Sequence, residues 1–224
     1  MYLKFKNCSN KRFFLILDTV VISIIIPIMN YLRTINICSP GYNASCALCC
    51  GSHNYKALCG EISVLFQQRT ESVDTYISLK QNFKNFSDDD YSSLLHAVSS
   101  CSLPKLHDDA IQCPFVGYVQ SSSVIGCLIY PQSSSTDLRG KRLTGNTCKH
   151  FSCVAREVLT DEEIIFAASL MRDWYYYSLF INDIAFLKKT FIEYKHAENV
   201  TSDIIENIKE DLTTSLFEHV LIGK

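Results

Sequence analysis

The distribution of cysteines constrains this chain more than any other feature of its sequence. Eleven of the 224 residues are cysteine, and Cys46, Cys49 and Cys50 form a CxxCC group. A CxxC places two thiolates on one tight turn, so that both sulfurs can bind a single ion and a distant pair can complete a tetrahedron. Cysteine at this density is unusual for an ordinary cytosolic enzyme and indicates either a metal site or a disulfide framework.

Eight of the cysteines are predicted to bind metal. Because neighbouring side chains of an extended segment point apart, Cys50 is expected to serve a second ion, or another corner of a multi-iron cluster, rather than the ion of Cys49. Cys8, Cys38 and Cys101 lie outside the motifs and are interpreted as small buried hydrophobic residues, with one further ligand among them left open. The predicted ligands are Cys46, Cys49, Cys50, Cys59, Cys113, Cys127, Cys148 and Cys153.

Four motifs, in chain order, carry a resemblance to a known family. They are Cys46-Ala47-Leu48-Cys49-Cys50-Gly51, Cys113-Pro114-Phe115-Val116, Gly126-Cys127-Leu128-Ile129-Tyr130-Pro131 and Cys148-Lys149-His150-Phe151-Ser152-Cys153. This ordered set resembles the YkgJ-type cysteine-cluster family over about residues 46–153. The resemblance implies a zinc- or iron-chelating domain, so the expected cofactor is an iron–sulfur cluster or zinc. After Pro131 a Gln/Ser/Thr run replaces the family's Arg-Pro step, which leaves open whether Cys148 or Cys153 takes the last family position.

A disulfide framework is the alternative interpretation, and it would suit an exported chain. The odd number of cysteines argues against it, as does the strain of a bridge between the adjacent Cys49 and Cys50. His53 and His150 lie close to the cysteine motifs. Each is a candidate zinc ligand, a hydrogen-bond donor to a thiolate or a solvent-exposed residue.

An apolar segment over residues 13–29 follows a basic N-terminus and raises the question of a membrane anchor. About 20 apolar residues cross a bilayer, but Asp18 and Pro27 interrupt this run, and a charge near mid-span costs about 3 kcal/mol. A spanning helix and a buried or interfacial helix both stay open. The protein is expected to be cytoplasmic. If the apolar segment is an anchor, membrane contact is expected through residues 13–32.

Helix signals dominate the remainder of the chain. Ser87 before three aspartates is typical of an N-cap and predicts a helix that begins at residue 88. Thr160 and Glu163 match a capping box, and the apolar spacing predicts one helix that continues through the aromatic block of residues 174–177 to residue 179. A further helix is predicted over residues 203–219.

Strand-like alternation is scarce, and short extended segments are predicted only over residues 115–119 and 125–130. The predicted fold class is mainly α with irregular metal-bound loops, a small α+β fold in which helices flank a cysteine-ligated core. Three regions are predicted: a hydrophobic helix over residues 1–36, a cysteine-cluster metal-binding domain over residues 37–160, and a helical C-terminal arm over residues 161–224.

Common enzyme signatures are absent from the sequence, including the Gly-rich phosphate loop, GxGxxG, HExxH and GxSxG. The 21 basic and 23 acidic side chains leave a net charge of −2, so no nucleic-acid partner is expected. The leading hypothesis is a metal-binding protein with a structural or electron-transfer role. An iron–sulfur-dependent enzyme that acts on a protein partner, or a disulfide-bonded exported interaction protein, are the alternatives.

Overall fold

The computed structural model describes residues 34–79, 87–99, 102–110, 112–119, 123–130, 152–195 and 200–222, with side chains described as far as residue 214. The predicted membrane-contact segment over residues 13–32 lies outside these residues, as do Cys8, Cys101, Cys148 and His150. None of the described helices combines the length and apolar character that crossing a bilayer requires.

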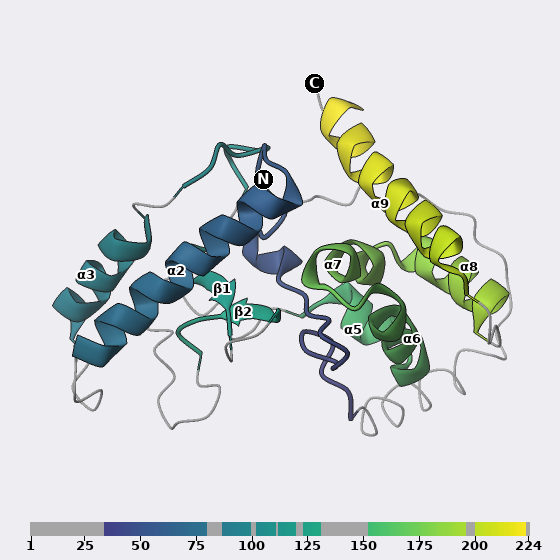
Figure 1. The fold of residues 1–224 in the computed structure, drawn as a ribbon, viewed down its shortest axis with the longest axis horizontal. Coiled ribbons are helices and arrows are strands. Elements are labelled where there is room, and N and C mark those ends of the chain that lie inside the picture. Colours follow the sequence, from purple (N-terminus) through teal and green to yellow (C-terminus); the bar gives the residue numbers. More distant parts are fainter. Residues whose placement is uncertain are drawn as a thin grey trace, which may run out of the picture.

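The described part of the chain is mainly helical, with one small antiparallel sheet, which confirms the predicted mainly α, small α+β class (Figure 1). In Figure 1 helices α2 and α3 lie with the sheet at one end of the molecule, and helices α5 to α9 lie at the other. In chain order the elements are η1 (Leu48–Cys50), α2 (Cys59–Leu79), α3 (Asp88–Ser99), β1 (Val116–Tyr118), β2 (Ile125–Cys127), α5 (Val154–Val158), α6 (Asp161–Met171), α7 (Trp174–Asn182), α8 (Ile184–Tyr194) and α9 (Ser202–Ile222).

Helices α2 and α3 enclose the smaller of two hydrophobic clusters. Helix α3 begins as predicted, because Ser87 Oγ accepts a hydrogen bond from the Asp90 amide at 3.2 Å and Asp90 Oδ2 accepts one from the Ser87 amide at 2.9 Å. Its apolar stripe then meets the C-terminal half of α2. The buried residues of this cluster are Val73, Leu94, Val98, Phe115 and Ile129.

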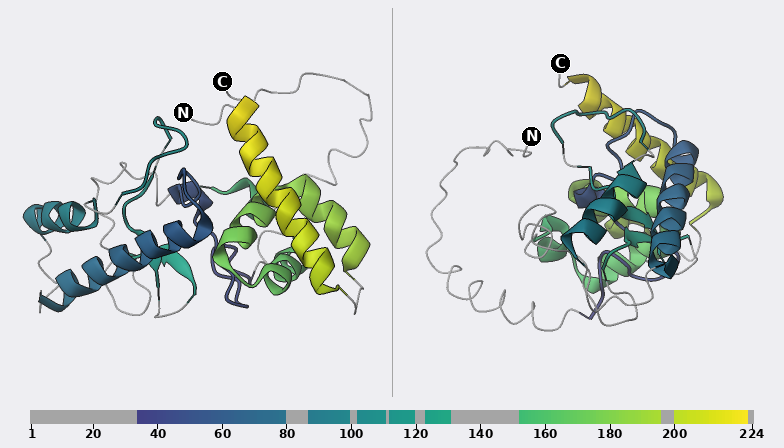
Figure 2. Two further views of the ribbon diagram at one scale, coloured as in Figure 1. Left: turned by 45° about the horizontal axis from the view of Figure 1, so that its top comes forward. Right: turned by 90° about the vertical axis from the view of Figure 1, so that its left-hand side faces the viewer.

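The larger hydrophobic cluster joins the first half of α2 to helices α6 to α9. Helix α7 packs against α6, α8 and α9, so it lies at the centre of this helical group (Figure 2). Ile62 and Phe66 of α2 belong to the same cluster as Ile164 of α6 and Ile208 of α9. The predicted helix over residues 203–219 is confirmed as part of α9.

The prediction of one unbroken helix from residue 161 to residue 179 is wrong, because the chain turns between α6 and α7. Arg172 has a left-handed backbone with a φ of 53°, which ends α6. Asp173 then caps α7, with its carboxylate accepting a hydrogen bond from the Tyr176 amide at 2.7 Å. The turn brings Trp174, Tyr175 and Tyr177 into the larger cluster, so the aromatic block is core.

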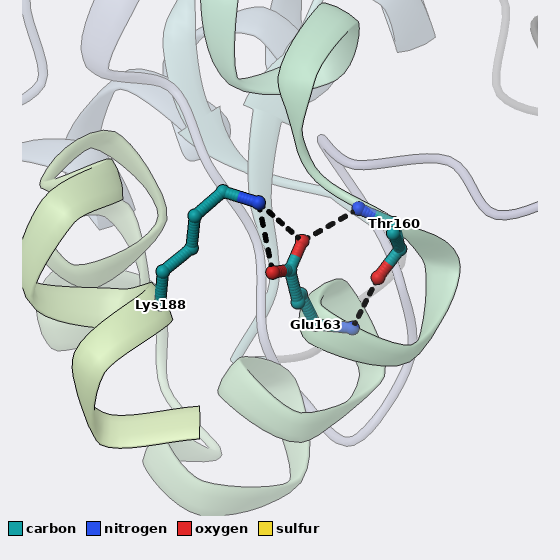
Figure 3. A network of polar contacts seen from close by, with 3 residues as sticks. All are labelled: Thr160, Glu163 and Lys188. Atoms are coloured by element: carbon teal, nitrogen blue, oxygen red, sulfur yellow. Dashed lines mark hydrogen bonds and ion pairs between the residues drawn. The ribbon is translucent and has the colours of Figure 1, made fainter. Parts of the chain in front are cut away.

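The capping box predicted at residue 160 is confirmed and gains a third member from α8 (Figure 3). Glu163 Oε2 accepts a hydrogen bond from the Thr160 amide at 2.8 Å, and the Glu163 amide donates to Thr160 Oγ1 at 3.2 Å. Lys188 Nζ lies 2.9 Å from Glu163 Oε1. Burial raises the pKa of this carboxyl, but the hydrogen bonds from Thr160 and Lys188 outweigh burial, so the net pKa is lowered. The network ties the start of α6 to α8.

The two predicted strands are confirmed as a short antiparallel pair, in which Val116 lies opposite Cys127 and Gly117 opposite Gly126. The sheet packs directly on α2, where Thr70 Oγ1 accepts a hydrogen bond from the Tyr118 amide at 2.7 Å. A Cβ atom at Gly117 would lie 2.7 Å from both Leu128 Cδ1 and Thr70 Oγ1. Only glycine allows this close approach between the strand and the helix.

We therefore expect Gly117→Ala to lower the free energy of unfolding by about 1–3 kcal/mol, because the added methyl group overpacks the contact between β1 and α2. Gly60→Ala, in the first turn of α2 where a Cβ meets nothing within 4 Å, is the matched control. It should leave stability unchanged or raise it by up to about 1 kcal/mol. Urea unfolding of both variants measures the difference, and equal stabilities would contradict the close packing of the sheet on α2.

Candidate metal centre

Residues 34–58, here called the cysteine loop, connect the N-terminal side of the structure to α2 and carry Cys38, Cys46, Cys49 and Cys50. The loop lies between the two ends of the molecule, with η1 placed near the start of α2 and beside α7 (Figure 1). Left-handed residues fold its first part back on itself, with φ values of 99° at Gly41, 57° at Tyr42 and 60° at Asn43. Cys46 consequently returns to Cys38, whose carbonyl accepts a hydrogen bond from the Cys46 amide at 3.1 Å.

Helix α7 supplies hydrogen-bond partners to this loop along most of its length. Tyr177 Oη donates to the Ile37 carbonyl at 2.9 Å, and Ser178 Oγ donates to the Ser45 carbonyl at 3.2 Å. Asn182 Nδ2 donates to Cys46 Sγ at 3.5 Å. Since the loop has little regular secondary structure, these contacts satisfy polar groups that would otherwise be buried without partners.

The CxxCC turn contradicts the expectation that Cys49 and Cys50 point apart. Their sulfurs lie only 3.9 Å from each other, because η1 is a tight 3-10 turn and not an extended strand. Gly51 ends the turn with a φ of 80°, and its amide donates to the Leu48 carbonyl at 2.9 Å. Two thiolates on one tetrahedral zinc, each about 2.3 Å from the ion, are about 3.8 Å apart. The spacing of this pair therefore fits a shared ion.

The pKa values of the Cys49 and Cys50 thiols are shifted in opposite directions. The pKa of Cys49 is lowered to about 7, first by the hydrogen bond from the Cys50 thiol and then by nearby backbone amides, while burial opposes the shift. The pKa of Cys50 is raised well above its ordinary value by that same hydrogen bond, by burial, and by the neighbouring Cys49, Cys113 and Cys127. The exposed Cys49 is thus the better nucleophile of the two.

Cys38, Cys46 and Cys153 form a first group of thiols within electrostatic range of Tyr177, whose pKa is raised first by burial and then by these three thiols. Burial raises the pKa of Cys46 to about 12, against a hydrogen bond from the Leu48 amide. Burial of its sulfur, with the charges of Cys49 and Cys153, raises the pKa of Cys38 to about 11. Cys38 as a residue is exposed, so its interpretation as a buried hydrophobic residue is wrong.

A second group of thiols forms where the sheet meets the cysteine loop. The Cys113 amide donates to the Cys50 carbonyl at 2.9 Å, and Cys127 at the end of β2 lies within electrostatic range of Cys50. Cys113 packs against both hydrophobic clusters. This group therefore lies at the junction of the two ends of the molecule.

The structure places Cys59 apart from both groups. At the first position of α2, its thiol interacts with Ser63 and Asp173 and with no described cysteine. Burial is the main cause of its raised pKa. Of the eight predicted ligands, five lie in the two groups and Cys49 lies beside Cys50. Cys59 lies in neither group, and Cys148 lies outside the described residues.

Arg69 of α2 is a buried cation beside the second group. Its side chain is 3% exposed, and its guanidinium donates to Tyr55 Oη at 2.9 Å and to the Cys113 carbonyl at 3.3 Å. Arg69 Nε has no hydrogen-bond partner in the described part of the structure, and no described carboxylate pairs with this guanidinium. A buried cation is costly without a nearby negative charge, which a thiolate-bound metal site would supply.

His53 is excluded as a ligand in this conformation because both ring nitrogens have other partners. Nε2 donates to the Tyr175 carbonyl at 3.0 Å, and Nδ1 accepts from Ser52 Oγ at 2.9 Å. The ring packs against Trp174 and Tyr175, and burial lowers its pKa to about 4, partly opposed by the hydrogen bond to Tyr175. His53 is therefore a neutral core residue that anchors the cysteine loop to α7.

This histidine makes the fold sensitive to mild acid. Its pKa is about 4 in the folded chain and 6.5 in its ordinary state, so the unfolded chain binds more protons between these values. Its contribution to stability is complete above about pH 6.5 and is lost as the pH falls toward 4. Between pH 7.5 and pH 5 we expect a loss of about 2 kcal/mol in the free energy of unfolding, measured with urea. His53→Gln, which does not titrate, should lose correspondingly less, and equal losses in both proteins would contradict this assignment.

All the cysteines that the structure describes are free thiols. Within the described ranges, no three cysteine, histidine or carboxylate side chains form a group that could hold a metal ion as they stand. The sulfurs of each group are therefore neighbours without being arranged as a closed coordination shell.

No protein-family model, no curated protein and no solved structure matches this chain. The resemblance to the YkgJ-type family stays a prediction based on the motifs.

Proposed function

We propose that this protein binds a thiophilic metal through its cysteines and that the metal clamps the two ends of the fold together. The ion is zinc, or iron within an iron–sulfur cluster. The observation that carries the proposal is the convergence of cysteines from separate parts of the chain on the Cys49–Cys50 pair. Cys38 and Cys46 lie within electrostatic range of Cys49, and Cys153 lies within range of Cys38. Cys113 and Cys127 lie within range of Cys50.

The charges around the thiols support this proposal. Four thiolates on one divalent ion leave a net charge of −2, which is stabilised by nearby cations. The two groups each have such a cation: Arg156 acts on Cys38, and the buried Arg69 guanidinium lies on the Cys113 carbonyl. Metal-bound thiolates would in turn compensate Arg69, whose charge has no described carboxylate beside it.

A structural role follows from where the cysteines lie. The cysteine loop has few regular backbone hydrogen bonds of its own, and Cys113 lies between the two hydrophobic clusters. A metal bound there would add cross-links to the larger hydrophobic cluster, which already joins α2 to the C-terminal helices. The free energy of metal binding would then contribute directly to folding, as it does in other small metal-dependent domains.

Closing either group around a metal ion would require its sulfurs to move, because no described group is arranged to hold an ion as it stands. Rotation of a cysteine between two staggered rotamers moves its sulfur by about 3 Å without a change in the backbone. Cys49 is exposed, so its side chain has room for such a rotation. The Cys49–Cys50 pair already has the required spacing and would serve as the starting point for binding.

The test is elemental analysis and a visible spectrum of protein purified without oxygen, followed by chelation. We expect at least one zinc per chain, or iron with acid-labile sulfide, and a fall in Tm of several degrees when a chelator removes the metal. Reloading the chelated protein with zinc should restore the original Tm. This recovery is the control for damage by the chelator. If the chelator harmed the protein in another way, the Tm would stay low after zinc is added back.

Cys49→Ser and Cys113→Ser, which lie in different parts of the chain, should each lower the bound metal and bring the Tm toward that of the chelated wild type. Protein that contains neither metal, with its thiols free and its Tm insensitive to chelation, would overturn the proposal. Protein with its thiols blocked as disulfides would instead favour the exported, disulfide-bonded alternative.

A further inference from the structure

We propose that Cys49 and Cys50 form a reactive dithiol that undergoes exchange with the disulfide of a low-molecular-weight oxidised thiol. Cys49 is the attacking thiol. Cys50 is the resolving thiol, which means that it releases the part of the disulfide that Cys49 has captured. This reaction goes beyond metal binding, because it needs only the two sulfurs and no bound ion.

The backbone of the CxxCC turn brings the two sulfurs together. The Cys50 amide donates to the Ala47 carbonyl at 3.0 Å, and the Gly51 amide donates to the Leu48 carbonyl at 2.9 Å. In an extended segment, adjacent side chains would point to opposite faces. In this 3-10 turn the sulfurs of Cys49 and Cys50 lie 3.9 Å apart, a distance at which one thiol donates a hydrogen bond to the other.

The two thiols differ in their access to solvent, and this difference gives each of them a role. Cys49 is exposed, so a dissolved disulfide can reach it. Cys50 is half-buried and packs against the larger hydrophobic cluster, and its carbonyl accepts a hydrogen bond from the Cys113 amide at 2.9 Å. Access is one of the factors that set the rate of thiol–disulfide exchange. The incoming disulfide therefore meets Cys49 first, and Cys50 is held beside the sulfur that has reacted.

The reaction has two exchange steps. Cys49 Sγ loses its proton to solvent and attacks one sulfur of the incoming disulfide, whose S–S bond breaks as the new bond to Cys49 forms. The departing sulfur takes up a proton and leaves as a thiol. Cys50 Sγ then loses its proton and attacks Cys49 Sγ, which expels the second thiol in the same way. Both protein thiols are oxidised to a disulfide, and the incoming disulfide is reduced to its thiols.

The disulfide that results is strained, so the reaction is readily reversed. The sulfurs must close from 3.9 Å to about 2.05 Å. The Cα atoms of adjacent residues are about 3.8 Å apart, which is less than the roughly 4.4–6.8 Å that most disulfides span. Strained disulfides have higher reduction potentials and are the labile ones. We therefore expect excess free thiol to return the oxidised pair to its reduced form.

Exchange and metal binding exclude each other because they use the same sulfurs. A sulfur in a disulfide has no thiolate to offer a metal ion, and a thiolate bound to an ion is not free to attack. The exchange is therefore measured on the reduced full chain after treatment with a chelator, so its outcome does not depend on whether the protein binds metal.

The experiment mixes this protein with an equimolar amount of glutathione disulfide in the absence of oxygen and follows the intact mass of the chain. In the wild type we expect a transient glutathione adduct, then an adduct-free chain that has lost both thiol hydrogens. Cys50→Ser should keep the adduct, because the resolving thiol is missing. Cys49→Ser should react at least about tenfold more slowly, since the accessible thiol is missing.

Two further cysteines supply matched controls. Cys59 lies at the first position of α2, outside the turn, and is half-buried as Cys50 is. Cys38 is exposed as Cys49 is. Cys59→Ser and Cys38→Ser should both capture and release glutathione as the wild type does. The Tm of each reduced variant is measured first. If serine at position 50 lowers the Tm, Cys50→Ala repeats the test with an apolar side chain suited to a half-buried site.

The outcomes separate this inference from the proposed function. A glutathione adduct that persists on the wild type overturns the inference, as does an adduct that Cys50→Ser releases at the wild-type rate. An unchanged first step in Cys49→Ser also overturns it. Protein that binds neither zinc nor iron but shows the expected exchange overturns the proposed metal binding alone. Protein that binds metal but fails to resolve the adduct after chelation overturns the dithiol reaction alone.

Discussion

The contact between the cysteine loop and helix α7 is the interaction on which the rest of this structure depends. The loop has too little regular secondary structure to satisfy its own buried polar groups, so α7 supplies partners through Tyr177, Ser178 and the Tyr175 carbonyl. These contacts hold the thiols of the loop beside the sheet and beside Cys153. Because α7 also packs against α6, α8 and α9, the position of the loop is coupled to the whole helical group.

The pKa values of the thiols and the arginines near them determine how the candidate metal centre could bind a cation. Several thiols in this region have raised pKa values, since burial and neighbouring thiolates oppose ionisation. A divalent cation would reverse that balance by replacing protons, and Arg69 and Arg156 would offset the excess negative charge. The same buried guanidinium that lacks a described carboxylate partner thus becomes part of a balanced arrangement when thiolates are present. His53 contributes differently, as a neutral ring that packs the loop against α7 and titrates only at the cost of stability.

Local signals in the sequence predicted those elements that depend on residues near each other along the chain. The caps at Ser87 and Thr160 begin α3 and α6 because a side-chain oxygen meets an amide three residues later. Gly51 likewise ends the CxxCC turn through a local left-handed backbone. The break at Arg172 escaped prediction, since apolar spacing continues across it and the turn is favoured by the burial of the following aromatic residues in the core.

The sequence by itself determined that the fold is mainly helical, that two short segments are extended, and that the CxxCC segment forms a turn. Only the tertiary structure decided which of the described cysteines are neighbours: it brings Cys38 to Cys46, separates Cys59 from the other described thiols, and sets the Cys49 and Cys50 sulfurs 3.9 Å apart. The physical reason is that helices, turns and caps arise from contacts a few residues apart. The grouping of thiols depends instead on contacts such as that between Tyr177 and Ile37, which lie 140 residues apart in the chain.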